Sequence, residues 1–490
     1  MNSLSKELQE EQIRIEKLAK DLGLDFFETV FEMVDYKEMN QIAAYGGFPV
    51  RYPHWKFGMD YDSLSKSYEY GLSKIYELVI NNDPCYAYLL EGNSFLDQKL
   101  VMAHVYGHCD FFKNNKWFSK TNRKMMDQMA NHATRIRRYI DKYGINKVEK
   151  FIDTCLSLDN LIDRHAPYAE EKIDLIRDKV ELVQAAGFEK KAYMESYMRS
   201  MKGEPDSEPF TPQAPEGKVY HSEKDILKFL ISNAPLEDWE QDVLSILRDE
   251  AYYFAPQGMT KIMNEGWASY WHAKMMTEHI CTDSEIVCFC DTHSGTMAMS
   301  PNGFNPYKIG IELFRDIEKR WNKGQFGLDW LECDNLVEKA NWDKNLGLGK
   351  EKIFEVRRDF NDVMFIDHFL TEEFCVENKF FVYKYNEQKK VFEVDTKDFA
   401  AIKAKLLFQL TNFGQPIIQA VDSNFENRGE LLLTHMFEGI ELQPDYMNET
   451  LQRVQALWRK PVCLATVLDK SPSLVTYDGK EFNIKKLENM

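Results

Sequence analysis

Two histidines four residues apart, in a stretch that is otherwise apolar, constrain the fold of this chain more than any other feature. His104 and His108 belong to the segment VMAHVYGHCDFF, which has the spacing of a helix in a core. Residues i and i+4 share one face of a helix, so the two imidazoles can converge on one cation. The pair also fits ordinary core or surface histidines, and the spacing alone does not separate the two interpretations.

A second string supplies the ligand type that the histidine pair lacks. In NEGWASYWH, Glu265 lies early in an aromatic-rich helix, and the string is similar to the one from which thermolysin-like zinc aminopeptidases take their third metal ligand. Two histidines and a glutamate are a usual ligand set of catalytic zinc. Glu265 follows His108 by 157 residues (265 − 108), so distant helices would have to build the site. The alternative is a helix-capping Glu265 beside aromatic residues of the core.

The general base of such a site is not obvious. The His-x-x-x-His spacing is that of H-E-x-x-H zinc hydrolases, but Val105 replaces their glutamate. Glu91, which precedes the histidine segment, and Asp110, which follows it, are the candidate bases. Asp110 is equally suited to orienting an imidazole. Tyr106 is a candidate for stabilising an oxyanion.

A third histidine lies on the helix predicted for Glu265. His272 is seven residues further along, roughly 10 Å at helical rise, which is too far to share a metal with Glu265. It is a candidate for substrate binding or proton transfer, with a structural or imidazole-supporting role as the alternative. In the string DTHSG, His293 is either a further ligand or acid, or part of a capped turn.

Two other strings are rich in polar groups. After a pair of glycines, a proline-fixed loop presents Arg51, His54 and Trp55, which suits recognition of a carboxylate or sugar-like ligand, or else forms a rigid connection. The segment EIVCFCD, followed by His293, has metal-type side chains without C-x-x-C spacing. We interpret it as a buried strand whose cysteines act as small apolar residues.

Charge and hydropathy exclude several classes of protein. The chain carries 61 Lys and Arg against 79 Asp and Glu, a net charge of −18, which disfavours nucleic-acid and membrane-surface binding. It contains no apolar run of membrane-spanning length and no signal segment, and its nine cysteines do not suggest a disulfide framework. Phosphate-binding glycine motifs are absent as well. We expect a soluble, cytoplasmic protein.

The periodicity predicts a mainly α protein with two domains. Residues 1–378 form a large helical, zincin-like region that includes a Pro-rich loop or linker at 203–217. From residue 379 to 490 a hairpin, short β-type runs and one helix over Asn448–Trp458 predict a small α+β domain. Helical spacing is also predicted from Asp62 to Asn82, and the pattern of Cys85–Leu90 is typical of a strand.

Several long strings together identify the family that the chain resembles. YGGFPVRYPHWKFG, AHVYGHCDFFKNN and MNEGWASYWH, followed by DTHSG, NGFNPYKIG and RDFNDVMFIDHFLT, resemble the SpoVR (stage V sporulation protein R) family from about residue 25 to 485. The resemblance implies a role in spore cortex (peptidoglycan) formation or in stationary-phase or stress physiology. It also implies partners, a PrkA-type serine kinase and a von Willebrand A-like protein. The family motifs match at His104, His108, Asp110, Glu265 and His272.

Two functions remain open at this point. The first is a metallohydrolase of amide or peptide bonds, in which His104, His108 and Glu265 bind zinc or another divalent metal that activates a water. The second is a non-catalytic regulator or assembly protein with a metallopeptidase-like fold, acting with the kinase system. Val105, in place of the usual base, argues against the metallohydrolase, and the acidic composition is compatible with the regulator. The oligomeric state is not predicted.

Overall fold

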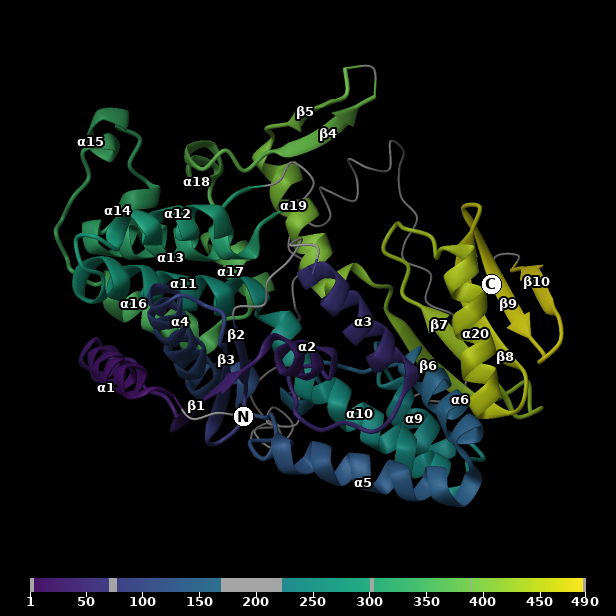
Figure 1. Cartoon of the computed structure of the whole chain (residues 1–490). Coiled ribbons are helices and arrows are strands. Elements are labelled where there is room, and N and C mark those ends of the chain that lie inside the picture. The colour runs from purple at the N-terminus through teal and green to yellow at the C-terminus, as the bar shows by residue number, and fades with distance from the viewer. Residues whose placement is uncertain (1–3, 70–76, 169–222, 300–303, 388, 488–490) are drawn as a thin grey trace, which may run out of the picture. The chain divides into compact units, whose positions relative to one another are not determined.

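The computed structural model describes residues 4–69, 77–168, 223–299, 304–387 and 389–487. Within these ranges the chain is mainly helical, as predicted (Figure 1). The Pro-rich segment 203–217 lies outside the described residues. None of the helices described is long and apolar enough to span a lipid bilayer.

The chain folds into two compact units that each combine two segments. One unit comprises Met1–Ala133 and Pro256–Leu407, and the other comprises Thr134–Ala255 and Phe408–Met490. The candidate residues singled out above all fall in the first unit. The domain boundary expected at residue 379 stays a prediction.

A small sheet opens the first unit. β1 (Thr29–Val34) pairs in parallel with β3 (Cys85–Leu90), and β3 pairs antiparallel with β2 (Glu77–Ile80). The prediction of a strand at Cys85–Leu90 is confirmed. The prediction of helix up to Asn82 is wrong, because α3 (Trp55–Glu69) ends earlier and β2 takes its backbone hydrogen bonds from β3. A short apolar run fits either period, and strand pairing decides between them.

Helices make up most of the first unit. Those before residue 133 are α1 (Lys6–Asp21), α2 (Tyr36–Ala44), α3, α4 (Phe95–Asn114), the 3-10 turn η1 (Lys116–Phe118) and the start of α5 (Met125–Tyr143). Those after residue 256 are α11 (Lys261–Met275), the π-helical η2 (Met276–Ile280), α12 (Ile286–Thr296), α13 (Pro306–Lys323), α14 (Leu328–Leu331), α15 (Leu336–Ala340), α16 (Gly349–Asp359), α17 (Asp362–Phe369), α18 (Glu372–Glu377) and α19 (Phe399–Leu410). The predicted hairpin is present as β4 (Val382–Asn386) and β5 (Val391–Thr396).

Glycines allow three helices to pack closely in the core of this unit. α11 contacts α4 and α13, and Figure 1 shows it between them. A Cβ atom at Gly107 of α4 would lie 2.7 Å from Cα of Ala268 in α11. A Cβ at Gly310 of α13 would lie 2.6 Å from Cα of Gly266 in α11. The first contact brings the histidine helix and the glutamate helix together at the level of the candidate ligands, and the second packs α13 against the same part of α11.

The second unit contains the predicted α+β tail. Its five-stranded sheet has the order β10-β9-β8-β7-β6, in which only the pair β7–β8 is parallel. The strands are β6 (Ile418–Phe425), β7 (Glu430–His435), β8 (Val462–Leu468), β9 (Ser471–Tyr477) and β10 (Phe482–Lys486). Among the described residues of this unit, the helical elements include the end of α5, α6 (Ile145–Leu156), α9 (Ile226–Asn233), α10 (Asp238–Met259), η3 (Thr411–Gly414) and α20 (Pro444–Trp458). The predicted helix Asn448–Trp458 is confirmed within α20, which packs on β8 and β9.

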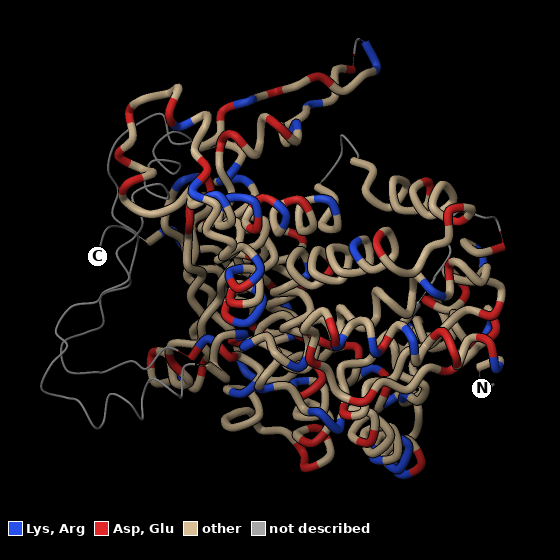
Figure 2. The backbone as a smooth tube through the Cα atoms, turned by 90° about the vertical axis from the view of Figure 1, so that its left-hand side faces the viewer, with Lys and Arg blue, Asp and Glu red and all other residues tan. Residues whose placement is uncertain are grey.

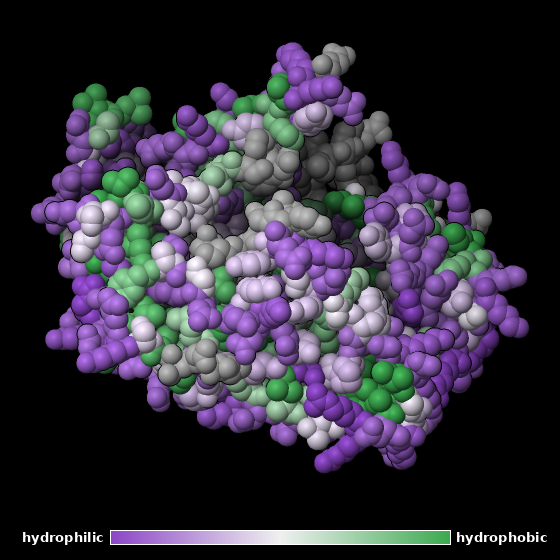
Figure 3. All heavy atoms as spheres, viewed as in Figure 1, coloured by the Kyte–Doolittle hydropathy of each residue, from purple (hydrophilic) through white to green (hydrophobic). Residues whose placement is uncertain are grey.

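Charged residues of both signs are interspersed along the described chain rather than gathered by sign (Figure 2). In the view of Figure 3, hydrophilic residues cover most of the visible surface and apolar ones form small patches. Among the large apolar residues that the structure describes, the most exposed are Leu336 (80%) and Val337 (72%) of α15 and Leu328 (71%) of α14.

Candidate metal centre

The two histidines project from one side of α4. Ser94 caps this helix by accepting a hydrogen bond from the backbone of Asp97. His104 and His108 are both buried, and their rings lie 4.6 Å apart and nearly perpendicular. The i, i+4 spacing therefore brings the imidazoles together inside the core.

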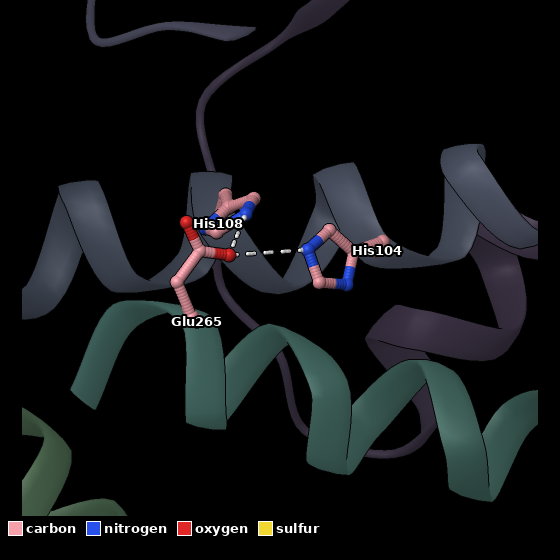
Figure 4. Close-up of side chains that lie close together, drawn as sticks. All are labelled: His104, His108 and Glu265. Atoms are coloured by element: carbon pink, nitrogen blue, oxygen red, sulfur yellow. Dashed lines mark ion pairs between the residues drawn. The ribbon is translucent and has the colours of Figure 1, made fainter. Parts of the chain in front are cut away.

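Glu265 reaches the same point from α11. Its Oε2 lies 3.6 Å from Nε2 of His104 and 3.5 Å from Nε2 of His108 (Figure 4). The three ligand atoms lie within 4.8 Å of one another, and all three side chains are buried. Among the residues that the structure describes, this is the one group of three or more His, Cys, Asp or Glu side chains so arranged. The structure thus brings together the three ligands predicted from sequence.

The outer nitrogens of the imidazoles are occupied by other side chains. His104 Nδ1 lies 2.7 Å from Nδ1 of His272, and His108 Nδ1 lies 2.9 Å from Oδ1 of Asn264. Each ring is therefore held from behind with Nε2 directed at Glu265. Metal-binding histidines in proteins are usually fixed in this way by a partner on the nitrogen that does not bind the metal.

The geometry fits a divalent metal. Ligand atoms on a tetrahedral ion at about 2.0–2.1 Å lie about 3.3 Å apart, close to the two separations measured here. Oε2 of Glu265 is buried and makes no hydrogen bond to another described residue. An unsatisfied buried carboxylate oxygen is costly, and a cation between it and the imidazoles would satisfy it.

Electrostatics keep Glu265 ionised. Burial acts to raise its pKa, but His104, His108 and Lys261 outweigh burial and hold the pKa well below its usual range. Nζ of Lys261 donates to Oε1 of Glu265 at 2.6 Å. One carboxylate oxygen is thus held by the lysine and the other faces the imidazoles.

A row of three histidines leads away from the centre. Behind the contact with His104, Nε2 of His272 lies 3.1 Å from Nδ1 of His293 in α12. Burial, followed by the neighbouring histidines, holds the pKa of His272 well below its usual value, so its ring is neutral. His272 thus supports His104 and lies apart from Glu265, whereas the proton-transfer role considered for it stays a prediction.

Asp110 and Tyr106 lie on other faces of α4. The carboxylate of Asp110 accepts hydrogen bonds from Nε1 of Trp267 and the backbone N–H of Asp25, both at 2.8 Å. Burial, partly offset by Arg357, raises the pKa of Asp110 to about 6. Tyr106 is fully buried against Phe26, with ring centroids 4.7 Å apart. Asp110 ties α4 to α11, and the catalytic roles considered for both residues stay predictions.

The other candidates lie in different surroundings. Glu91 is exposed on the turn after β3. Arg51 is buried, with Nη1 3.4 Å from Sδ of Met129, and stacks near Phe57. His54 is buried too, whereas Trp55 is 52% exposed. Arg51 and His54 are therefore not presented to solvent, and substrate binding by this loop stays a prediction.

The interpretation of EIVCFCD as a buried strand is wrong. The segment forms the start of α12, in which Cys288 and Cys290 are exposed. β-Branched and aromatic residues favoured a strand, but one side of the segment packs on the core through Phe289 while the rest faces solvent. Its helical form carries His293 to His272.

Three residues at the centre were not assigned a role from sequence. Asn264 supports His108, Lys261 binds Glu265, and Tyr307 stacks on His104 with ring centroids 6.4 Å apart. Lys261 lies one helical turn before Glu265, and this i, i+4 spacing was the available signal. For Tyr307, which lies on another helix, the local sequence offered no signal.

A carboxylate from another helix positions the start of α11. Asp362, the first residue of α17, accepts hydrogen bonds from the backbone N–H groups of Ile262 and Met263 at 2.8 and 2.9 Å. Thr260 precedes α11 without a side-chain cap, so Asp362 does the capping. The contact holds the first turn of the helix that carries Glu265.

The pH dependence of stability should reveal this cap. Burial, partly offset by the two backbone bonds, raises the pKa of Asp362 to about 7. Since the folded chain then binds the proton more tightly than the unfolded chain, Asp362 makes the free energy of unfolding fall as pH rises from about 4 to 7. We expect Asp362→Asn to lose this decrease in the free energy of unfolding, which is at most ~4 kcal/mol. Urea unfolding of the wild type and of Asp362→Asn at several pH values measures it. Asp110, whose pKa is also raised, is present in both proteins, so its contribution cancels in the comparison. If the free energy of unfolding depended on pH in the same way in both proteins, the raised pKa would not belong to Asp362.

Comparisons with known proteins cover almost the whole chain. The family model described as SpoVR like protein matches residues 2–415, and the model described as SpoVR-like C-terminal domain matches residues 416–469. The chain is similar to "Uncharacterized protein YcgB" of Escherichia coli (strain K12), with 30% identity in an alignment that covers 92% of this chain and 90% of the relative. No solved structure matches the chain.

Proposed function

This chain belongs to the SpoVR family, and from this premise we propose that it is a metal-dependent hydrolase of amide or peptide bonds, centred on His104, His108 and Glu265. The observation that carries the proposal is the approach of Oε2 of Glu265 to both Nε2 atoms at 3.5–3.6 Å inside the core. A buried N,N,O ligand set with supported imidazoles is typical of catalytic zinc.

In this proposal the side chains of the centre have two roles, metal binding and support of the metal-binding histidines. His104, His108 and Glu265 hold the cation, while His272 and Asn264 fix the two rings. Bound there, zinc or another divalent metal supplies Lewis-acid activation of water and of a carbonyl group. The two helices enclose the ligands, which keeps the local dielectric low and the electrostatic interactions strong.

The zincin-like fold is part of this proposal. As in H-E-x-x-H enzymes, two ligands come from one helix and the third comes from another. Val105 stands at the position of their base and is fully buried. A base would then come from Glu91 or Asp110, as proposed from sequence, or from a group of the substrate. We also propose that the protein is cytoplasmic and that it acts in spore cortex formation or in stationary-phase or stress physiology.

One observation favours a second candidate function. Among the described residues, the clustered metal-type side chains include no carboxylate besides Glu265, so the usual base has no replacement there. A metal centre of this kind can hold helices together without catalysis. The second candidate is therefore a regulator or assembly protein that acts with a PrkA-type kinase and a von Willebrand A-like protein.

Metal content tests the centre. We expect the wild-type protein, purified without chelator and dialysed after adding zinc, to retain about one equivalent by elemental mass spectrometry. His104→Ala and His108→Ala should retain almost none, because two remaining ligands rarely hold zinc against dialysis. His279→Ala, a substitution in the nearby η2, is the matched control and should match the wild type.

The outcomes separate the two functions. Retained metal with hydrolysis of amide or peptide substrates would support the enzyme, and retained metal without hydrolysis would favour the regulator. Folded wild-type protein that retains no metal would refute the metallohydrolase.

A further inference from the structure

One side chain connects the buried centre to solvent. Nζ of Lys261 lies 2.6 Å from Oε1 of Glu265, whose side chain is 8% exposed, whereas the lysine side chain is 56% exposed. The Lys261 side chain therefore lies between solvent and the buried carboxylate of Glu265. An incoming molecule on this side meets Lys261 beside the ligands.

Tyr307 lies on the same side. It follows Asn305, which caps α13, and its ring lies nearly parallel to that of His104. Nζ of Lys261 lies 5.9 Å from the centroid of the Tyr307 ring. Lys261 touches the glutamate ligand and Tyr307 stacks on a histidine ligand, so the two side chains flank the centre together.

The local charge on this side is positive once a cation is bound. A divalent cation and Lys261 bring three positive charges, and Glu265 brings one negative charge. In a chain with a net charge of −18, such a concentration of positive charge attracts an anionic ligand.

We propose that Lys261 and Tyr307 form the substrate side of the centre and select substrates that carry a carboxylate next to the bond to be cleaved. The inference rests on the proposed metal centre and adds a substrate class to it. An ammonium has three donors, of which one is used on Glu265, and the others can bind a carboxylate oxygen. The Tyr307 ring covers the adjoining surface and orients the ligand against His104.

Binding of acetate and of its neutral analogue acetamide tests this substrate side. Both probes are titrated into the full-length protein loaded with cobalt(II), and the visible absorption of the cobalt reports binding. We expect acetate to bind at least tenfold more tightly than acetamide. Lys261→Met should weaken acetate binding roughly tenfold or more, the usual effect of losing a hydrogen bond to a charged group, and leave acetamide unchanged. Lys261→Arg should restore most of the preference.

Matched variants and the cobalt content make every outcome decisive. Lys274→Met removes a lysine from the same helix beside Trp271 and should behave as wild type. If wild type takes up no cobalt, the metal centre itself is wrong. If all variants take up cobalt but Lys261→Met binds acetate as tightly as the wild type, only the substrate side is wrong. Loss of cobalt from Lys261→Met would also overturn the inference, because it would assign Lys261 to metal retention.

Discussion

Replacing Glu265 by glutamine is expected to remove the stabilisation that zinc gives to the wild-type protein while leaving the metal-free chain folded. Zinc at a thousandfold excess over its Kd should add about 4 kcal/mol to the wild type, because it binds only the folded centre. Glutamine has nearly the same shape, and its single oxygen can still accept a hydrogen bond from Lys261. Its NH2 group then faces the imidazoles, and a neutral amide NH2 does not bind zinc. The loss of affinity should exceed the roughly 10- to 100-fold loss typical of outer partners.

Thermal unfolding with and without zinc measures this difference. The midpoint of the wild type should rise with zinc concentration, and that of Glu265→Gln should stay constant. Glu278→Gln, which changes an exposed glutamate in η2, is the control and should follow the wild type. An equal rise in Glu265→Gln and wild type would show that the Glu265 carboxylate is not a ligand. A metal-free variant that unfolds would instead show that the charge itself holds the core together.

The three candidate ligands could be predicted from sequence because each carries its own local signal. The i, i+4 spacing places His104 and His108 on one face whatever surrounds the helix. Glu265 was found by its string, although the string does not state that α11 lies against α4. The residues that support the candidate ligands were harder to predict. The sequence gives only the distance of His272 from Glu265 along their common helix. Its actual partner is His104 on the neighbouring helix, and a contact between crossing helices has no expression in local spacing.

The errors in the fold have a related cause. Val79 of β2 and Val287 of α12 lie in short apolar runs that suit both a helix and a strand. β2 is a strand because it pairs with β3, and α12 is a helix because one of its faces packs on the core. The hairpin β4–β5 and the strand Cys85–Leu90 were predicted correctly because turn residues or a proline bound them on at least one side.

The close packing of α11 against α13 depends on two glycines. Gly266 and Gly310 face each other, and neither position has room for a methyl group. The atoms in the way belong to the backbone of the opposite helix, so no side chain can rotate to make room. Glu265 is the neighbour of Gly266, and a shift of α11 away from α13 would move the ligand with it.

Gly310→Ala is therefore expected to destabilise the first unit by about 3 kcal/mol or more, at the upper end of the cost of overpacking. The added Cβ would lie 2.6 Å from Cα and 2.9 Å from N of Gly266, and the two helices would have to separate. Gly58→Ala is the matched control, since Gly58 lies within α3 and a Cβ added there would meet no other atom within 4 Å. There the better helix propensity of alanine should raise stability by up to about 1 kcal/mol. Urea unfolding followed by circular dichroism measures both changes, and a wild-type midpoint for Gly310→Ala would contradict the close packing that places Glu265 at the histidines.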